Sequence, residues 1–568
     1  MPMAVLRSRR EFDRSFAGKI SRAELWTATG IFLLVLILRI LYATHYRIDS
    51  DEPQHLHVVW GWAQGMIPYR DYFDNHSPLF HLLCAPLFAL LGVRPDIVIP
   101  MRCAMIPLFA LSVFFVGRIA GTLYSARVGL WAAVFTAVCP RFFFVSTEFR
   151  PDDLWALLWF ATLFTTVAGR MTLLRNFLVG FLLGAAFCVS IKTTLMLVSM
   201  ILATVVLLAL RIRAGKPVPL ATLIRVGLPI AAGILALPLI VFLFFAVQGS
   251  IGQLFYCLIT HNIPPASHVR LLRALKWFGL LIISLALGIF LFGRSVGEAK
   301  KQTALWIFFV TVFYYVTLKS FSPILNNEDY LPSDPLFMMV LAVGIFSLPW
   351  STAGALGRNS WGIPICLGFV GLAYIVVSEP PFRDQTADKI SMIETALRLT
   401  TRSEYVMDSK GETIYRRRPF YYILEGMTGM RIKAGLIKDT IAEQLIATET
   451  RLVTVLRMPA KAAAFIQKNY VPIAFRLSVL GQMLRQQGND FPLDIVVPGE
   501  YTFVSECGAF AGMLNGKPVS GAIDLEPGHY EMSRTNGSGR LAVVWARAVE
   551  KGYTPFVPLK EDRWTAQD

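Results

Sequence analysis

Long apolar runs alternate with short polar loops over the first two thirds of the chain. The runs recur from Leu25 to about Ser378, and the chain is polar beyond Glu379. A helix that crosses a hydrocarbon core of about 30 Å needs roughly 20 apolar residues. The pattern predicts an all-α polytopic membrane bundle of about 11 transmembrane helices, near residues 25–46, 99–117, 128–146, 153–169, 176–191, 194–210, 223–247, 276–293, 304–319, 333–349 and 361–378.

One apolar stretch, from Leu79 to Leu91, is too short to be a span. Counting it as a crossing would also place Arg118 and Arg127 on the wrong side of the membrane. We therefore expect an interfacial or re-entrant helix here. Residues 47–98 then form one long first external loop on the membrane surface.

The polar end of the chain changes character along its length. Residues 379–490 alternate helical stretches with short strands, which predicts an external mixed α/β region. In residues 491–568, short β runs are broken by the turn signals Pro498-Gly499, Asn515-Gly516 and Pro527-Gly528. These residues predict an external β-rich, β-sandwich-like module behind a transmembrane domain at 25–378.

Composition and charge agree with a membrane protein. Of the 568 residues, 55% are hydrophobic and only 16% charged, which is too apolar for a soluble globule. The net charge of +16 comes from basic residues in short loops on one side of the spans, which favours the positive-inside rule over nucleic-acid binding. We expect a multi-pass protein of a bacterial inner or plasma membrane, with residues 1–24 as a cytoplasmic basic N-terminus and an extracytoplasmic C-terminal domain.

The predicted spans carry almost no ionisable residues. Arg39 and Lys192 lie towards helix ends, where long side chains can reach the interface. Transport pathways usually need ionisable groups at mid-depth, so this pattern argues against a transporter. The candidate chemistry therefore lies in the external loops.

The first external loop begins with three carboxylates, Asp49, Asp51 and Glu52, in the sequence RIDSDEPQHLH. One interpretation is structural: Asp49 or Ser50 caps the helix that follows Pro53. The other is chemical, because a carboxylate beside a lipid-facing cleft is suited to accept a proton.

A second acidic element, FRPDDLW, contains Arg150, Asp152 and Asp153 where a loop enters the fourth span. These carboxylates could cap that helix. They also project from the same predicted membrane face as Asp51, and carboxylates from separate loops can together activate a hydroxyl and orient a sugar or metal.

Between these elements, PYRDYFDNHSPLFHLL supplies Arg70, Asp74 and His76. Its cationic groups could hold a lipid phosphate, and His76 could do so only when protonated. An interfacial turn with an aromatic belt would give a similar pattern.

A later external loop supplies His261, Arg270 and Arg273. We expect the arginines to contact phosphate or carrier lipid. His261 with a first-loop carboxylate is a weak metal signal.

The order of these motifs resembles the GT-C glycosyltransferases, specifically the protein O-mannosyltransferase and lipid A aminoarabinose transferase group. The resemblance covers roughly residues 25 to 350. It rests on Asp51-Glu52 after the first span, YFDNHSPLF before a short helix, RPDDLW opening a later span, His261, and DYLPSDP before the tenth span.

The resemblance implies the roles of individual residues. Asp51 corresponds to the catalytic aspartate of the first loop, Asp152 corresponds to the second acidic position, and Glu52 lies beside Asp51. His261 resembles a position that binds a divalent metal, with Asp74 as partner. Relatives have Lys-Pro where this chain has His76-Ser77-Pro78, which puts the phosphate-binding role of that segment in doubt.

The implied reaction is transfer of a hexose or pentose, with inversion, from a polyprenyl-phosphate-linked donor to a hydroxyl of a lipid, glycan or protein acceptor. The alternatives are a lipid-linked saccharide flippase and a non-catalytic envelope scaffold that binds glycans through its β-rich end.

Overall fold

The computed structural model describes residues 20–265, 270–293, 299–322, 324–347, 362–487 and 490–556, with residues 270–276 and 291–293 described by their backbone alone. The chain forms two compact units. The helical unit contains the described residues up to Arg47, together with Asn75–Cys84 and Ile99–Asp384. The mixed unit contains Ile48–Asp74, Ala85–Val98 and the described residues from Gln385 onward. The first external loop thus contributes to both units.

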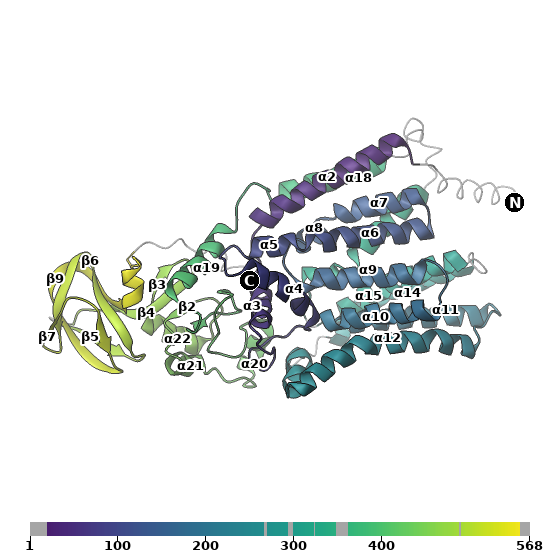
Figure 1. Ribbon diagram of the computed structural model, residues 1–568. Helices are drawn as coiled ribbons and strands as arrows, with labels where there is room; N and C mark the ends of the chain where they lie inside the picture. Colours follow the sequence, from purple (N-terminus) through teal and green to yellow (C-terminus); the bar gives the residue numbers. More distant parts are fainter. Residues whose placement is uncertain are drawn as a thin grey trace. The chain divides into compact units, whose positions relative to one another are not determined.

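The helical unit is built from helices packed around an aromatic core that includes the fully buried Trp131 and Trp155. Helices α6, α7, α9, α10 and α12 lie side by side in Figure 1, and α15 packs on α11 and α14. The helices are α2 (Arg22–His45), α6 (Ile106–Leu123), α7 (Ala126–Ala137), α8 (Pro140–Val145), α9 (Pro151–Val167), α10 (Leu173–Val189), α11 (Thr193–Arg213), α12 (Leu220–Val247), α13 (Ile251–Phe255), α14 (Arg270–Gly293), α15 (Ala299–Phe321), α16 (Asp334–Ser347) and α18 (Gly362–Ser378). Helices α4 (Leu79–Leu91) and α5 (Val98–Cys103) each contribute to both units.

Every predicted span overlaps at least one of these helices. Five segments of the described chain are long and apolar enough to cross a membrane: Arg22–His45, Val98–Leu123, Thr193–Arg213, Leu220–Val247 and Ala299–Phe321. The chain is therefore a mostly helical, multi-pass membrane protein. The number of crossings stays a prediction.

The predicted span at 128–146 is wrong in one respect, because the structure divides it into α7 and α8. Cys139 is extended, with φ −67° and ψ 113°, and it precedes Pro140. A proline disfavours helical backbone in the residue before it, which explains the break. Helix α4 spans the residues predicted for the short helix, and its interfacial position stays a prediction.

Arg39 does not reach towards an interface as predicted. Its side chain is buried, and its Nη1 donates to the Phe143 carbonyl oxygen at 2.8 Å and to Thr147 Oγ1 at 2.7 Å. Backbone acceptors freed at the end of α8 therefore bind the terminal nitrogens of this arginine inside the bundle.

The mixed unit joins α3 (Asp51–Ala63) to the C-terminal part of the chain. Its core includes the fully buried Leu452, Leu477 and Val479. Its later helices are α19 (Ala387–Leu399), α20 (Gly426–Lys433), α21 (Ile441–Ala447), α22 (Ala460–Asn469) and α23 (Ala546–Glu550). Its strands are β1 (Val406–Met407), β2 (Leu452–Thr454), β3 (Tyr470–Ala474), β4 (Leu477–Leu484), β5 (Asp490–Ile495), β6 (Gly499–Leu514), β7 (Lys517–Val519), β8 (Ile523–Leu525) and β9 (Gly528–Trp545).

The predicted strand-rich end is confirmed. Within the described residues, its strands join strands β1–β4 of the preceding mixed region in one nine-stranded network. The order is β1-β2-β4-β9-β6-β7, with β3 on β4, β5 on β9 and β8 on β6. The pair β1 and β2 is parallel, and the other pairs are antiparallel. Asn515 and Gly516 both have positive φ and connect β6 to β7, as a two-residue hairpin turn requires.

Close packing of α10 against α12 depends on glycines at the contact. A Cβ atom at Gly233 of α12 would lie 2.2 Å from the Phe177 carbonyl oxygen and 2.6 Å from the Phe181 amide nitrogen. Small residues let two membrane helices approach backbone to backbone, which strengthens their van der Waals contact.

We expect Gly233→Ala to destabilise the helical unit by about 1–3 kcal/mol, because the added methyl group forces the two backbones apart. The matched control is Gly227→Ala on the same helix, where an added Cβ meets nothing within 4 Å. The midpoint of denaturant unfolding in detergent measures both. Equal midpoints for the two variants would contradict the packing role of Gly233.

Candidate functional site

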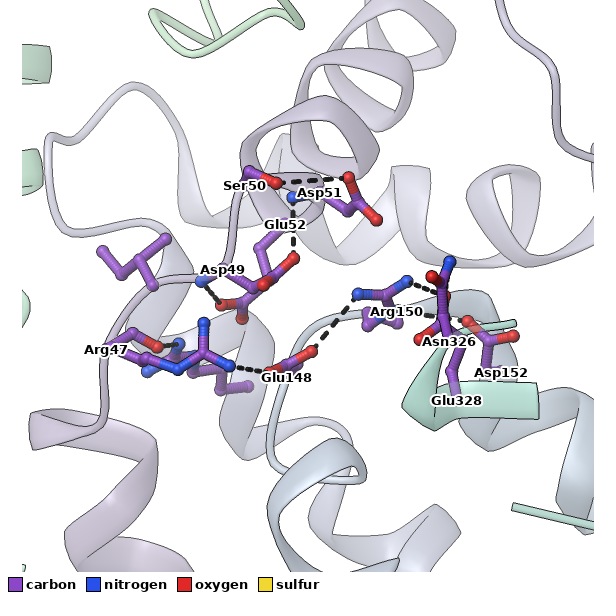
Figure 2. Close-up of polar contacts among 12 residues, drawn as sticks. Arg47, Asp49, Ser50, Asp51, Glu52, Glu148, Arg150, Asp152, Asn326 and Glu328 are labelled. Carbon is purple, nitrogen blue, oxygen red and sulfur yellow. Dashed lines mark hydrogen bonds and ion pairs between the residues drawn. The ribbon is translucent and has the colours of Figure 1, made fainter. Parts of the chain in front are cut away.

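The start of α3 carries the three carboxylates of the first external loop, and they have different environments. Asp49 Oδ1 accepts the Asp51 amide at 3.0 Å, and Glu52 Oε2 accepts the Asp49 amide at 2.9 Å. Ser50 is the N-cap residue but makes no side-chain capping bond. Asp49 and Glu52 therefore bind backbone amides at the helix start (Figure 2). The helix begins at Asp51, two residues before Pro53, and not after Pro53 as the structural interpretation expected.

Asp51 faces a different set of partners. Its Oδ1 lies 3.5 Å from Ser50 Oγ and also pairs with the Lys410 ammonium. The Asp51 side chain is 25% exposed, whereas Glu52 is fully buried. Of these two predicted catalytic residues, only Asp51 has a side chain that is exposed to solvent.

The sequence analysis did not identify Lys410 as a candidate site residue. It lies in Asp-Ser-Lys-Gly-Glu-Thr-Ile, residues 408–414, within the stretch predicted as a mixed α/β region. A single lysine flanked by polar residues resembles an ordinary surface loop, so the sequence carries no local signal of its role. In the structure its side chain is only 7% exposed.

Two further predicted residues of the mixed unit lie in contrasting places. Arg70 is exposed and contacts Asp71, with 2.8 Å between Nε and Oδ1, and this hydrogen bond lowers the pKa of the Asp71 carboxyl. Asp74 is buried. The phosphate-binding role of Arg70 and the metal-binding role of Asp74 stay predictions.

In the helical unit, Arg150 is held by three carboxylates (Figure 2). Its Nη2 lies 2.8 Å from Glu328 Oε1, its Nη1 lies 3.3 Å from Glu148 Oε2, and its Nε lies 3.5 Å from Asp152 Oδ2. Each of the four side chains is less than 10% exposed. We call these residues the Arg150 cluster.

The Arg150 cluster continues through charged and polar neighbours on both sides. Arg47 Nη2 lies 3.8 Å from Glu148 Oε1, and Asn326 Nδ2 donates to Glu328 Oε1 at 3.1 Å. Next to Glu328, Asp329 pairs with Lys192. Burial raises the pKa of the Glu328 carboxyl, while Arg150 and Lys192 oppose that shift.

The sequence pointed to Arg150 and Asp152 but not to their buried partners. Glu148 is two residues upstream of Arg150, and Glu328 directly precedes the segment DYLPSDP, which carried the resemblance. Only the fold brings these groups together. Asp153 is also buried at the start of α9, where Pro151 occupies the first turn and favours a helix start.

His261 ends a π-helical turn, Tyr256–Thr260, and is buried. Its amide donates to the Tyr256 carbonyl oxygen at 2.7 Å. The next residue, Asn262, donates through Nδ2 to the Asn75 carbonyl oxygen at 3.1 Å and so joins this turn to the segment that carries His76. Single π-helical turns are frequent at functional sites.

The sequence also suggested a metal site. In the part of the chain that the structure describes, no three His, Cys, Asp or Glu side chains gather closely enough to hold an ion. The predicted ligation by His261 and Asp74 stays a prediction. The side chains of Arg270 and Arg273 lie outside the described residues, so their predicted lipid contacts are not placed.

Residues 75–237 match the family model of dolichyl-phosphate-mannose-protein mannosyltransferases. No curated protein matches the sequence. The chain is similar in structure to ArnT from Cupriavidus metallidurans in the apo state, with a TM-score of 0.56 and 12% identity over 81% of this chain and 98% of that one.

ArnT from the same organism bound to undecaprenyl phosphate matches with a TM-score of 0.53 and 11% identity, over 80% of this chain and 97% of that one. At this identity the likeness concerns the fold. An oligosaccharyltransferase from Archaeoglobus fulgidus aligns at 11% identity with a TM-score of 0.42, over 79% of this chain and 72% of that one.

We expect Arg150→Gln to destabilise the helical unit by about 3–5 kcal/mol, because it leaves three buried carboxylates without their common counter-charge. Arg225→Gln removes an exposed arginine from the same unit and should leave stability unchanged. Denaturant titration in mixed micelles compares the two. A variant at 150 as stable as the control would show that Arg150 does not stabilise the carboxylates.

Proposed function

We propose that this chain, a GT-C superfamily protein related to the dolichyl-phosphate-mannose-protein mannosyltransferases and to ArnT, transfers a sugar from a polyprenyl-phosphate-linked donor to an acceptor hydroxyl. The family model at residues 75–237 and the fold of ArnT support the reaction class. The likeness to ArnT bound to undecaprenyl phosphate supports a polyprenyl-phosphate carrier. The acceptor is a lipid, glycan or protein at the outer membrane face.

Asp51 is the general base of the proposed reaction. The single observation that carries this assignment is the division of the carboxylates at the start of α3. Glu52 is fully buried and accepts the Asp49 amide, whereas a quarter of the Asp51 side chain is exposed. A base must come within about 3 Å of the proton that it removes, so it needs access to the substrate.

In the proposed step, the acceptor oxygen attacks the anomeric carbon as Asp51 takes its proton. The bond from that carbon to the phosphate oxygen breaks, and the phosphate leaves from the opposite face of the sugar with the bonding electrons. This displacement inverts the anomeric centre. Cationic side chains stabilise the departing phosphate, and electrostatic stabilisation of this kind is commonly a large part of catalysis.

The basic residues in and around the Arg150 cluster differ in exposure, and only Arg150 among them was a predicted binding residue. Arg150 is 8% exposed and engaged by three carboxylates, so we assign it to positioning Asp152. Arg47 and Lys192 keep 36% and 35% of their side chains exposed. These two cations are better placed than Arg150 to contact an anionic ligand.

Asp51→Asn should lower sugar transfer by about 10²- to 10⁴-fold, because an amide cannot accept the acceptor proton. The assay is mass spectrometry of envelope lipids, glycans and proteins from a deletion strain that carries wild-type protein or a variant. Loss of one hexose or pentose from a single product would identify the sugar and the acceptor.

Asp524→Asn, at an exposed position of β8, is the matched control and should retain wild-type transfer. Transfer by the Asp51 variant at the wild-type rate would remove Asp51 as the base. Carrier-lipid translocation by wild-type protein in vesicles, without any transfer product, would instead support a flippase.

A further inference from the structure

Residues 408–414, which we call the lysine loop, have a conformation held by their own side chains. Asp408 Oδ1 accepts the Gly411 amide at 2.6 Å, and Asp408 Oδ2 accepts the Thr413 amide at 3.0 Å and the Thr413 hydroxyl at 2.8 Å. Arg418 Nε lies 3.1 Å from Asp408 Oδ1 and balances its charge. One buried carboxylate therefore fixes both halves of the loop.

A second buried carboxylate attaches the lysine loop to the sheet. Glu412 accepts the Ser409 amide at 3.1 Å and the Ser409 hydroxyl at 2.8 Å. It also accepts the hydroxyl of Thr454, the last residue of β2, at 3.0 Å. The loop is thus fastened to a strand of the buried core rather than left as a surface connection.

Helix α3 packs on the lysine loop at a point away from Asp51. His57 Nδ1 lies 2.8 Å from the Ile414 carbonyl oxygen, and because that oxygen can only accept, Nδ1 carries the proton. Burial lowers the pKa of the His57 imidazole, which favours its neutral form. Gly411 has a φ of +83°, and a Cβ there would lie 2.6 Å from His57 Cβ, so helix and loop are in direct contact.

These contacts place Lys410 opposite the first turn of α3. Its side chain is 7% exposed and pairs with Asp51, a residue 359 positions earlier in the chain. An ammonium group taken out of water is costly unless a carboxylate or hydrogen bonds replace its hydration. Other charged groups around the helix start include Asp49, Glu52 and Lys389 of α19.

We propose that Lys410 is a positioning residue that orients the Asp51 carboxylate and keeps it ionised for proton transfer. This inference rests on the proposed transferase function. An opposite charge in contact favours the ionised form of a carboxylate, and the fixed lysine loop gives that charge a defined position. Moving a catalytic group by about 1 Å can lower the reaction rate on the order of a hundredfold. A rigid partner that holds the base in place would therefore raise the rate.

Lys410→Gln should lower kcat by about 10- to 100-fold, with the donor KM changed less than twofold. The acid limb of its pH–rate profile should move to higher pH, because the carboxylate loses the charge that favours its ionised form. Lys410→Arg, which keeps the charge on a differently shaped group, should recover part of the rate. Purified full-length protein and the donor identified from the envelope products serve for these measurements.

The matched control is Lys461→Gln, which removes an exposed ion pair with Glu443 from the same unit and should leave transfer unchanged. The double variant Asp51→Asn with Lys410→Gln should transfer no less than Asp51→Asn alone, because both changes act on one group. Lys410→Gln leaves the Asp51 carboxylate without its lysine, whereas the double variant removes both charges. The thermal midpoint of the double variant should therefore exceed that of Lys410→Gln. That comparison tests the pair even where the single variant folds poorly.

Three outcomes would overturn the positioning role: a wild-type kcat for Lys410→Gln, a raised donor KM with kcat unchanged, or a double variant less stable than Lys410→Gln. The second outcome would assign Lys410 to the donor phosphate. Failure of the proposed function itself is distinct, because wild-type protein would then show no transfer and Asp51→Asn would have no rate to lose.

Discussion

Arg150 lies between Glu148, Asp152 and Glu328, and all four side chains are almost completely removed from water. A buried charge must find an opposite charge or hydrogen-bonding groups, since the protein interior does not replace its hydration. This requirement explains why buried charged side chains of the helical unit lie beside opposite charges or beside carbonyl oxygens at helix ends. Arg102, for example, donates to the carbonyl oxygens of Tyr46 and Arg47, which are freed where α2 ends.

The same requirement separates structural from chemical roles at the start of α3. The carboxylates of Asp49 and Glu52 accept hydrogen bonds from backbone amides and so stabilise the helix start. The Asp51 side chain is partly exposed to solvent and forms an ion pair with the Lys410 ammonium group. A helix terminus of this kind holds a carboxylate in a defined direction while a substrate can still approach it, which suits the proposed base.

The partner of Asp51 also bears on the phosphate-binding role that was expected of the segment around His76. The resemblance led us to expect a lysine where this chain has His76-Ser77-Pro78, and these three residues lack a permanently cationic side chain. A lysine near the predicted base does occur, but it comes from the C-terminal part of the chain. The C-terminal region is therefore part of the chemistry in the proposal and more than a domain attached to a membrane enzyme.

Sequence alone determined the features that depend on local pattern. Apolar length predicted the helices, turn residues predicted the strand-rich end, and motif order predicted the superfamily, because each signal is carried by neighbouring residues. The break before Pro140 had a local signal too, but the continuous apolar run obscured it.

Tertiary structure decided which charges meet. Glu148 and Glu328 converge on Arg150, Arg39 finds carbonyl groups inside the bundle, and Lys410 reaches Asp51 across 359 positions of sequence. No sequence pattern predicts such ion pairs, because the energy of an electrostatic contact depends on distance in space and not on separation along the sequence.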